Sequence, residues 1–132
     1  MAMTEAMEEA GYSEKDVVYI NAHGTGTPLN DRVETMAIKR ALGEDKARQS
    51  YISSTKSMTG HMLGAAGAVE ALACLLALKE GIIPPTIHLY EQDEECDLYY
   101  VPNQAVQADI TLALSNSLGF GGHNACLAFR KV

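Results

Sequence analysis

The chain has 132 residues, about the size of one domain. Hydrophobic residues make up 47% of it and charged residues 20%, which is usual for a globular protein that buries its own core. The net charge of −7 argues against a nucleic-acid-binding surface, because such surfaces are basic.

The first part of the chain predicts a helix followed by a strand. Residues 1–10 place methionine and alanine on one helical stripe, and Gly11 stands where a helix ends. No capping residue precedes this helix, so we expect the chain to be cut from a longer one. After a polar turn at 13–16, the unbroken apolar run at 17–20 predicts a strand that is covered on both faces.

Two further helices and a strand are expected in the middle of the chain. Asp31 and Glu34 resemble a capping box and predict a helix that begins at Asp31 and ends near Leu42. Residues 51–53 form a second apolar run and predict a strand. Residues 63–80 are apolar almost all round and too short to span a bilayer, so they predict a helix buried inside a soluble protein.

The last third of the chain predicts an irregular segment and a strand pair. Residues 86–108 are acidic and read as a surface excursion with a short strand at 98–101. Strands are expected at 110–115 and 125–130, on either side of a glycine-rich turn. This order predicts one α/β domain over residues 1–132, with a mixed sheet of about five strands and helices on its faces.

A histidine follows the first predicted strand, in the motif Asn-Ala-His-Gly-Thr-Gly-Thr at residues 21–27. Glycines beside His23 allow a ligand to approach the backbone, and an imidazole donates a proton or hydrogen bond near neutral pH. Thr25 and Thr27 add hydroxyl groups. The motif indicates a site for carbonyl chemistry, although a loop histidine that caps nearby backbone groups would look the same.

A second histidine follows the next strand, in Ser-Thr-Lys-Ser-Met-Thr-Gly-His at residues 54–61. His61 precedes a predicted helix, whose positive end favours a developing anion. Glu70 lies within that apolar helix and needs a partner if it is buried, and Lys56 is the natural candidate. The alternative is a Glu70 that reaches a wet edge. Because ligand sites gather at the carboxyl ends of strands, both histidine loops can share one site.

Other kinds of site fit the sequence less well. The glycines after residue 60 lack the pattern of a phosphate-binding loop or a dinucleotide site, so no nucleotide cofactor is expected. The four histidines and the cysteines lack metal-ligand spacing, so no metal is expected. Cys74, Cys96 and Cys126 are odd in number and without Cys-x-x-Cys spacing, which predicts reduced thiols in a cytoplasmic protein.

The two histidine loops and the segment Asn-Ser-Leu-Gly-Phe-Gly-Gly at residues 116–122 are together similar to one family. They resemble, in order and spacing, the carboxy-terminal half of the elongating β-ketoacyl-acyl-carrier-protein synthases of the thiolase-like superfamily. The resemblance runs along the whole chain. It implies one half of a duplicated thiolase-like fold and a decarboxylative Claisen condensation in fatty acid elongation, with no cofactor.

The resemblance also implies a role for each candidate residue. His23 and His61 would stabilise the enolate formed from malonyl-carrier, and Lys56 and Glu70 would form a supporting ion pair. Thr25 and Thr27 would lie beside the pantetheine arm of the carrier. Phe120 would gate the pocket, and its backbone N–H would join the oxyanion hole. A histidine at position 61 fits an elongating enzyme, because initiating synthases carry asparagine there and thiolases replace one histidine with cysteine.

The sequence departs from the family pattern in two ways. Leu118 stands where phenylalanine is usual, which changes the packing around the gate. The nucleophilic cysteine belongs to the amino-terminal half of the family, and no cysteine of this chain matches it. We therefore expect the chain alone to be inactive in condensation.

The expected partners are acyl and malonyl carriers, the missing amino-terminal half and, for the whole enzyme, a second copy. An acidic carrier would need a basic patch, and the available cluster is Lys39, Arg40, Lys46 and Arg48. The rival interpretations are a non-catalytic ketosynthase-like partner subunit that binds the carrier and a piece of a polyketide ketosynthase.

Overall fold

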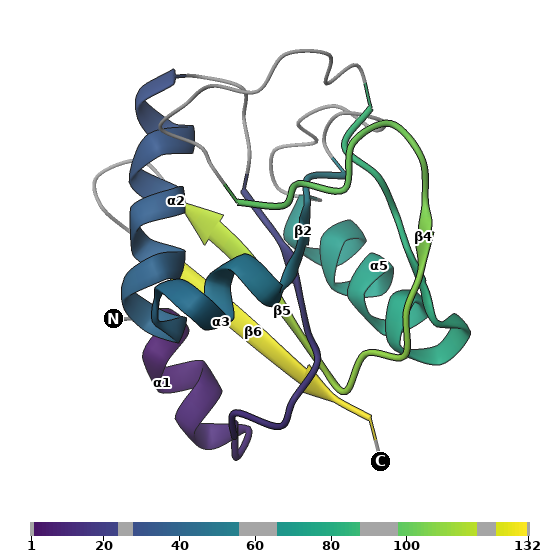
Figure 1. Cartoon of the computed structure of the whole chain (residues 1–132), viewed down its shortest axis with the longest axis horizontal. Helices are drawn as coiled ribbons and strands as arrows, with labels where there is room; N and C mark the ends of the chain where they lie inside the picture. The colour runs from purple at the N-terminus through teal and green to yellow at the C-terminus, as the bar shows by residue number, and fades with distance from the viewer. Residues whose placement is uncertain (1, 24–27, 56–65, 88–97, 119–123, 132) are drawn as a thin grey trace.

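A four-stranded mixed sheet forms the centre of the molecule (Figure 1). The computed structural model describes residues 2–23, 28–55, 66–87, 98–118 and 124–131. The strands lie in the order β2-β1-β5-β6, with bounds β1 (Val18–Asn21), β2 (Tyr51–Ser53), β5 (Leu112–Leu118) and β6 (Asn124–Arg130). β1 is parallel to β2 and β5, whereas β5 and β6 are antiparallel. The expected α/β fold with a mixed sheet is confirmed.

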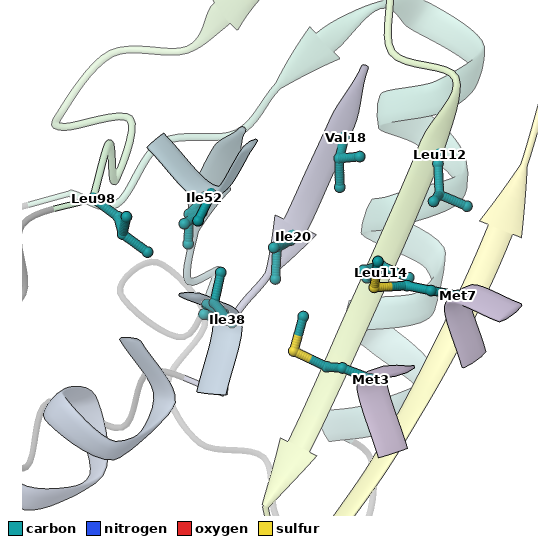
Figure 2. Packing of buried hydrophobic residues seen from close by; sticks show 11 residues of the cluster. Met3, Met7, Val18, Ile20, Ile38, Ile52, Leu98, Leu112 and Leu114 are labelled. Carbon is teal, nitrogen blue, oxygen red and sulfur yellow. The ribbon is translucent and has the colours of Figure 1, made fainter. Parts of the chain in front are cut away.

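Helices cover both faces of this sheet. They are α1 (Ala2–Glu9), α2 (Pro28–Leu42), α3 (Glu44–Gln49) and α5 (Ala66–Glu80). On one face, Ile20 of β1 and Leu114 of β5 belong to the same buried cluster as Met3 and Met7 of α1 and Ile38 of α2 (Figure 2). Burying such a side chain contributes about 1.5–3 kcal/mol, so this cluster is a main source of stability.

The opposite face of the sheet packs against α5. Side chains alternate along a strand, so Tyr19 and Ala113 point away from the first cluster. They form a second buried cluster with Cys74 and Ala77 of α5. The sheet is therefore the middle layer between α1, α2 and α3 on one side and α5 on the other.

The apolar helix, predicted to be buried, is buried on one side only. Leu72, Leu75 and Leu76 are 56%, 47% and 50% exposed, whereas Cys74 and Ala77 beside them are buried against the sheet. Because the helix has no polar face, its sequence could not indicate which side would remain uncovered. Within the described segments, no helix is long and apolar enough to cross a membrane.

The strand predicted at residues 98–101 is also wrong. Val101 has φ 39, a left-handed backbone conformation that a β-branched residue adopts at a cost, and it interrupts any extended run. The segment instead contacts its neighbours through isolated hydrogen bonds, such as the one that the Ile52 N–H donates to the Tyr99 carbonyl at 3.1 Å. An unpredicted two-stranded sheet pairs β3 (Ile82–Ile83) with β4 (Val106–Gln107). The central sheet thus has four described strands rather than about five.

Several element boundaries differ from those predicted. α2 begins at Pro28 rather than Asp31, since proline suits a first helical turn. α3 was not expected. The strands at the end of the chain were expected at 110–115 and 125–130, and they begin instead at Leu112 and Asn124.

The predicted glycine stop at Gly11 is confirmed, and Gly81 ends α5 in the same way. Gly11 has φ 71 and Gly81 has φ 67, so each occupies the left-handed conformation that ends a helix.

Candidate active site

Buried polar side chains gather where the parallel strands β1 and β2 end, beside the middle of β5. Asn21 at the end of β1 is paired in register with Ser53 of β2 and Ser115 of β5. All three are buried, as is Asn116, which follows Ser115. Buried polar groups are costly unless they meet hydrogen-bonding partners, so their concentration at one edge indicates a site rather than ordinary core.

Hydrogen bonds connect the end of β1 with the end of β2 and the residues that follow it. The Asn21 side-chain amide donates to Thr55 Oγ1 at 3.2 Å, and the Tyr19 and Ser53 hydroxyls are 2.8 Å apart. The Ala22 N–H donates to the Ser53 carbonyl at 2.8 Å, which continues the pairing of β1 and β2 by one residue. The loop that leaves β1 therefore starts from a fixed position.

His23 lies two residues beyond β1 and is 8% exposed. Its backbone N–H donates to Glu34 Oε1 at 2.7 Å, and the Glu34 side chain belongs to α2. Glu34 is also buried, at 4% exposed. A carboxylate that accepts a backbone N–H forms a strong, charge-assisted hydrogen bond. This bond holds the histidine backbone between the sheet and α2.

Glu70 lies on the side of α5 that is buried against the sheet, with 3% exposure. Cys74 is one helical turn further and also faces the sheet, where its thiol lies 3.8 Å from the Leu114 carbonyl. The alternative of a Glu70 that extends to a wet edge is therefore wrong. Its proposed partner Lys56 lies outside the described residues, so the ion pair stays a prediction.

Neither described cysteine is a candidate nucleophile. Burial, with the nearby Glu70 charge, raises the pKa of Cys74 to about 12, and burial raises the pKa of Cys126 to about 11. At neutral pH both remain thiols, whereas attack requires a thiolate. Both are free rather than disulfide-bonded, as predicted. Cys96 lies outside the described residues.

The structure places only part of the predicted site. His23 and Glu70 are described, and they approach the sheet from β1 and α5. Thr25, Thr27, Lys56, His61 and Phe120 lie outside the described residues, so their roles remain predictions. Among the residues that are described, no group of three or more histidine, cysteine, aspartate or glutamate side chains is arranged to hold a metal ion.

Sequence reasoning missed the function of Glu34. It was interpreted as half of a capping box with Asp31, but α2 begins earlier and the Glu34 carboxylate bonds His23 instead. Two residues of the basic cluster that was considered for an acidic carrier have partners within the chain. Lys46 donates to the Glu14 carbonyl at 3.1 Å, and Arg48 pairs with Glu44 at 2.9 Å.

Comparisons with known proteins identify the family of the chain. Residues 1–90 match the family model described as the C-terminal domain of beta-ketoacyl synthase. The chain is 56% identical over 130 residues to the 3-oxoacyl-acyl-carrier-protein synthase 2 of Staphylococcus aureus (strain COL). That match covers 98% of this chain but 31% of the relative, so the chain spans about a third of the curated relatives' length.

Two solved structures resemble the fold over nearly the whole chain. One is a type II polyketide ketosynthase in complex with its acyl-carrier protein, with TM-score 0.92 and 43% identity. It covers 100% of this chain and 33% of that one. The other is the ishigamide ketosynthase/chain length factor, with TM-score 0.88 and 42% identity, covering 96% of this chain and 30% of that one.

Proposed function

The chain belongs to the beta-ketoacyl synthase family as its C-terminal domain, and we propose that it supplies the enolate-stabilising half of a 3-oxoacyl-acyl-carrier-protein synthase. The reaction is the condensation of an acyl-enzyme with malonyl-carrier in fatty acid elongation. The observation that carries this proposal is the placement of His23, which is buried at the carboxyl end of β1 and held by Glu34.

The proposed chemistry uses the two histidines as hydrogen-bond donors. Decarboxylation of the malonyl thioester breaks the bond to the carboxyl carbon, which leaves as carbon dioxide, and the electron pair of that bond moves toward the thioester oxygen to form the enolate. His23 and His61 donate hydrogen bonds to that oxygen and stabilise the enolate, each by on the order of 3 kcal/mol. The enolate carbon then attacks the acyl-enzyme carbonyl, and the cysteine thiolate leaves.

The remaining predicted residues support this step. Lys56 and Glu70 form an ion pair behind the histidines, and burial of Glu70 against the sheet gives that carboxylate a reason to need a cation. Phe120 gates the pocket and contributes its backbone N–H to the oxyanion hole. Thr25 and Thr27 contact the pantetheine arm.

The nucleophilic cysteine comes from a second polypeptide segment in this proposal. The curated relatives are about three times longer than the match, and the pKa values of Cys74 and Cys126 are raised rather than lowered. The partners are therefore an amino-terminal half, acyl and malonyl carriers and, for the whole enzyme, a second copy. The reducing cytoplasm is the proposed location, because it keeps the Cys74 and Cys126 thiols free.

The exposed leucines of α5 are the surface that we assign to the amino-terminal half. Leu72, Leu75 and Leu76 lie on one side of the helix and are each about half exposed. Contiguous exposed apolar residues of this kind mark interaction surfaces. The part of the relatives that this chain does not match is long enough to provide the covering domain.

The test compares the chain alone with the chain joined to an amino-terminal half. That half is taken from the Staphylococcus aureus relative, which is about three times longer than the match. We expect no malonyl-dependent condensation by the chain alone and turnover by the joined protein. In the joined protein, His23→Ala or His61→Ala should slow malonyl decarboxylation by about 10²–10³-fold, as loss of one oxyanion-type donor does.

His88→Ala is the control, because His88 lies outside both histidine loops, and it should leave decarboxylation unchanged. Condensation by the chain alone would contradict the divided site. Unchanged decarboxylation in the His61→Ala protein would remove His61 from the mechanism.

A second candidate function is a non-catalytic partner subunit or a polyketide ketosynthase piece. The similarity to the ketosynthase/chain length factor pair favours this alternative. The same joined protein distinguishes the two, since a partner subunit would bind the carrier without decarboxylating malonyl-carrier.

A further inference from the structure

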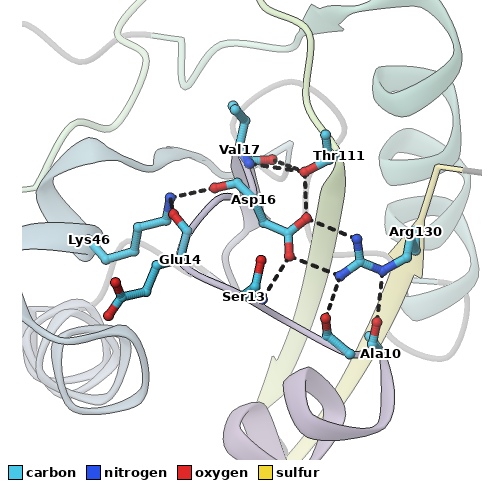
Figure 3. A network of polar contacts seen from close by, with 9 residues as sticks. Ala10, Ser13, Glu14, Asp16, Val17, Lys46, Thr111 and Arg130 are labelled. Carbon is cyan, nitrogen blue, oxygen red and sulfur yellow. Dashed lines mark hydrogen bonds and ion pairs between the residues drawn. The ribbon is translucent and has the colours of Figure 1, made fainter.

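A buried carboxylate lies at the end of the sheet opposite the candidate site. Asp16 precedes β1, and its side chain is 7% exposed (Figure 3). Arg130 at the end of β6 binds both carboxylate oxygens, through Nη1 to Oδ1 and Nη2 to Oδ2, each at 2.9 Å. The Thr111 hydroxyl donates to Oδ1 at 2.7 Å, and the Ser13 N–H donates to Oδ2 at 2.9 Å. Each carboxylate oxygen thus accepts two hydrogen bonds.

The same residues also bind the backbone around them. Arg130 donates from Nε to the Ala10 carbonyl at 2.7 Å (Figure 3). It also donates from Nη2 to the Gly11 carbonyl at 3.1 Å. Lys46 of α3 donates to the carbonyls of Glu14 and Asp16. The guanidinium therefore joins the end of β6 to the segment that connects α1 with β1.

Backbone bonds join Thr111 to Val17 at this point. The Thr111 N–H donates to the Val17 carbonyl at 2.9 Å, and the Val17 N–H donates to Thr111 Oγ1 at 3.0 Å. The Lys131 N–H donates to the Thr111 carbonyl at 3.1 Å. The starts of β1 and β5 and the end of β6 therefore meet in one small cluster.

The sequence of β1 gives little information about its register. All four of its residues are buried, so a shift by one residue would still place apolar side chains on both faces. β1 and β5 are parallel neighbours far apart in the chain, so no tight turn fixes their alignment. The side-chain bonds of Tyr19 and Asn21 run toward β2, so contacts outside the strand are needed to align β1 with β5.

We propose that Asp16, Thr111 and Arg130 form a latch that sets the lengthwise register of β1 against β5 and β6. The latch acts at the start of β1, and its effect reaches the other end because the strand is stiff and short. A slip by one residue would carry His23 about 3.3 Å along the strand direction. The latch itself does not depend on the proposed catalytic function.

The test measures amide hydrogen exchange, residue by residue, in the full chain. In Asp16→Asn and Arg130→Gln, we expect the amides of Thr111 and Leu112 to exchange about tenfold faster or more, because the local opening becomes easier. The amides of Cys74 and Ala77 in α5 should change by less than about twofold. Arg130→Lys should give an intermediate result, because lysine keeps the charge but cannot bind both oxygens in a fixed fork.

Lys131→Gln is the matched control. Lys131 is the next residue and pairs with Asp109 at 3.1 Å, but both side chains are largely exposed. Its loss should leave exchange at Thr111 and Leu112 unchanged. A uniform increase across β5 and α5 in the Asp16 or Arg130 variants would overturn the latch, since it would indicate general destabilisation. Unchanged exchange in those variants would overturn it as well.

A second measurement needs no substitution. Asp16 faces Arg130 of β6, Lys46 of α3, and Tyr12 and Glu14 in the turn before β1. Hydrogen bonds from Arg130 hold the pKa of Asp16 well below its ordinary value of 3.8, although burial opposes them. Because the folded-state pKa is lowered, the latch has its full effect above the ordinary value and weakens as the pH falls through the lowered one.

Carboxyl carbon NMR of the unmodified chain follows this titration directly. We expect an Asp16 midpoint below 3.8, together with shifts of the Thr111 and Leu112 amides in the same pH range. A midpoint at or above that ordinary value would overturn the latch.

Discussion

At the scale of single residues, the bond between Glu34 and the His23 backbone is the most informative contact. Both residues are buried, and the hydrogen bond joins α2 to the loop that leaves β1. A backbone N–H that loses its acceptor inside a protein costs more than the bond contributes, because water cannot replace the acceptor. Glu34 thereby fixes where the histidine backbone lies.

Glu34→Ala should therefore lower the free energy of unfolding by about 1–3 kcal/mol, whereas Glu34→Gln, which keeps a side-chain oxygen as acceptor, should cost less. Urea unfolding of the chain measures both, and exchange of the His23 amide reports the local effect. Glu44→Ala is the control, because Glu44 is exposed and its change should stay within about 0.5 kcal/mol. Equal losses for the alanine and glutamine variants would contradict the role of the acceptor.

At the scale of elements, β1 is the strand on which the domain depends. It lies between β2 and β5, so each of its sides is paired and each of its faces is covered. Ile20 is fully buried in the cluster that joins α1 and α2 to the sheet (Figure 2). A gap at this position cannot be filled by one neighbour moving, because α1, α2 and the sheet all pack there.

Ile20→Ala should reduce the free energy of unfolding by about 2–5 kcal/mol, and Ile20→Val by about 0.5–1.5 kcal/mol. The denaturant concentration at the midpoint of unfolding measures the loss, provided that the dependence of the free energy of unfolding on denaturant keeps the same slope. Val33→Ala on α2 is the comparison, because Val33 is 52% exposed and its truncation should cost far less. A loss at Ile20 no larger than at Val33 would contradict the assignment of this core.

At the scale of the whole molecule, the exposed side of α5 is the feature that a self-contained domain would not need. The side of α5 that faces away from the sheet carries Leu72, Leu75 and Leu76. A helix that is apolar all round is usually buried, and here only half of it is. This surface is the one that we assign to the amino-terminal half.

Replacing Leu72 and Leu76 with glutamine should weaken binding of the amino-terminal half by at least about tenfold, because two apolar side chains lose their burial. The same change should reduce self-association of the isolated chain, which analytical ultracentrifugation measures. The control replaces Val33 and Met36 of α2, which are 52% and 53% exposed, with serine and glutamine. If the α5 variant binds the amino-terminal half as tightly as the α2 variant does, the interface lies elsewhere.

The sequence predicted the larger elements well because their signals are local. The apolar runs of β1 and β2, the glycines at 11 and 81 and the smooth apolar helix each carry their own pattern. It failed at residues 98–101 and at α3, where a positive φ at Val101 and a short polar helix follow from packing. It also misassigned Glu34, because the capping pattern and the contact with His23 use the same carboxylate.

By itself, the sequence determined the family, the order of the larger strands and helices and the two histidine motifs, since these depend on residue types and their spacing along the chain. Only the tertiary structure decided which carboxylate holds His23, which side of α5 stays open, and that Asp16 joins three strand ends. Those contacts connect residues far apart in the chain, and their existence depends on how the layers stack. The pattern of one segment contains no information about the distant segment that will cover it.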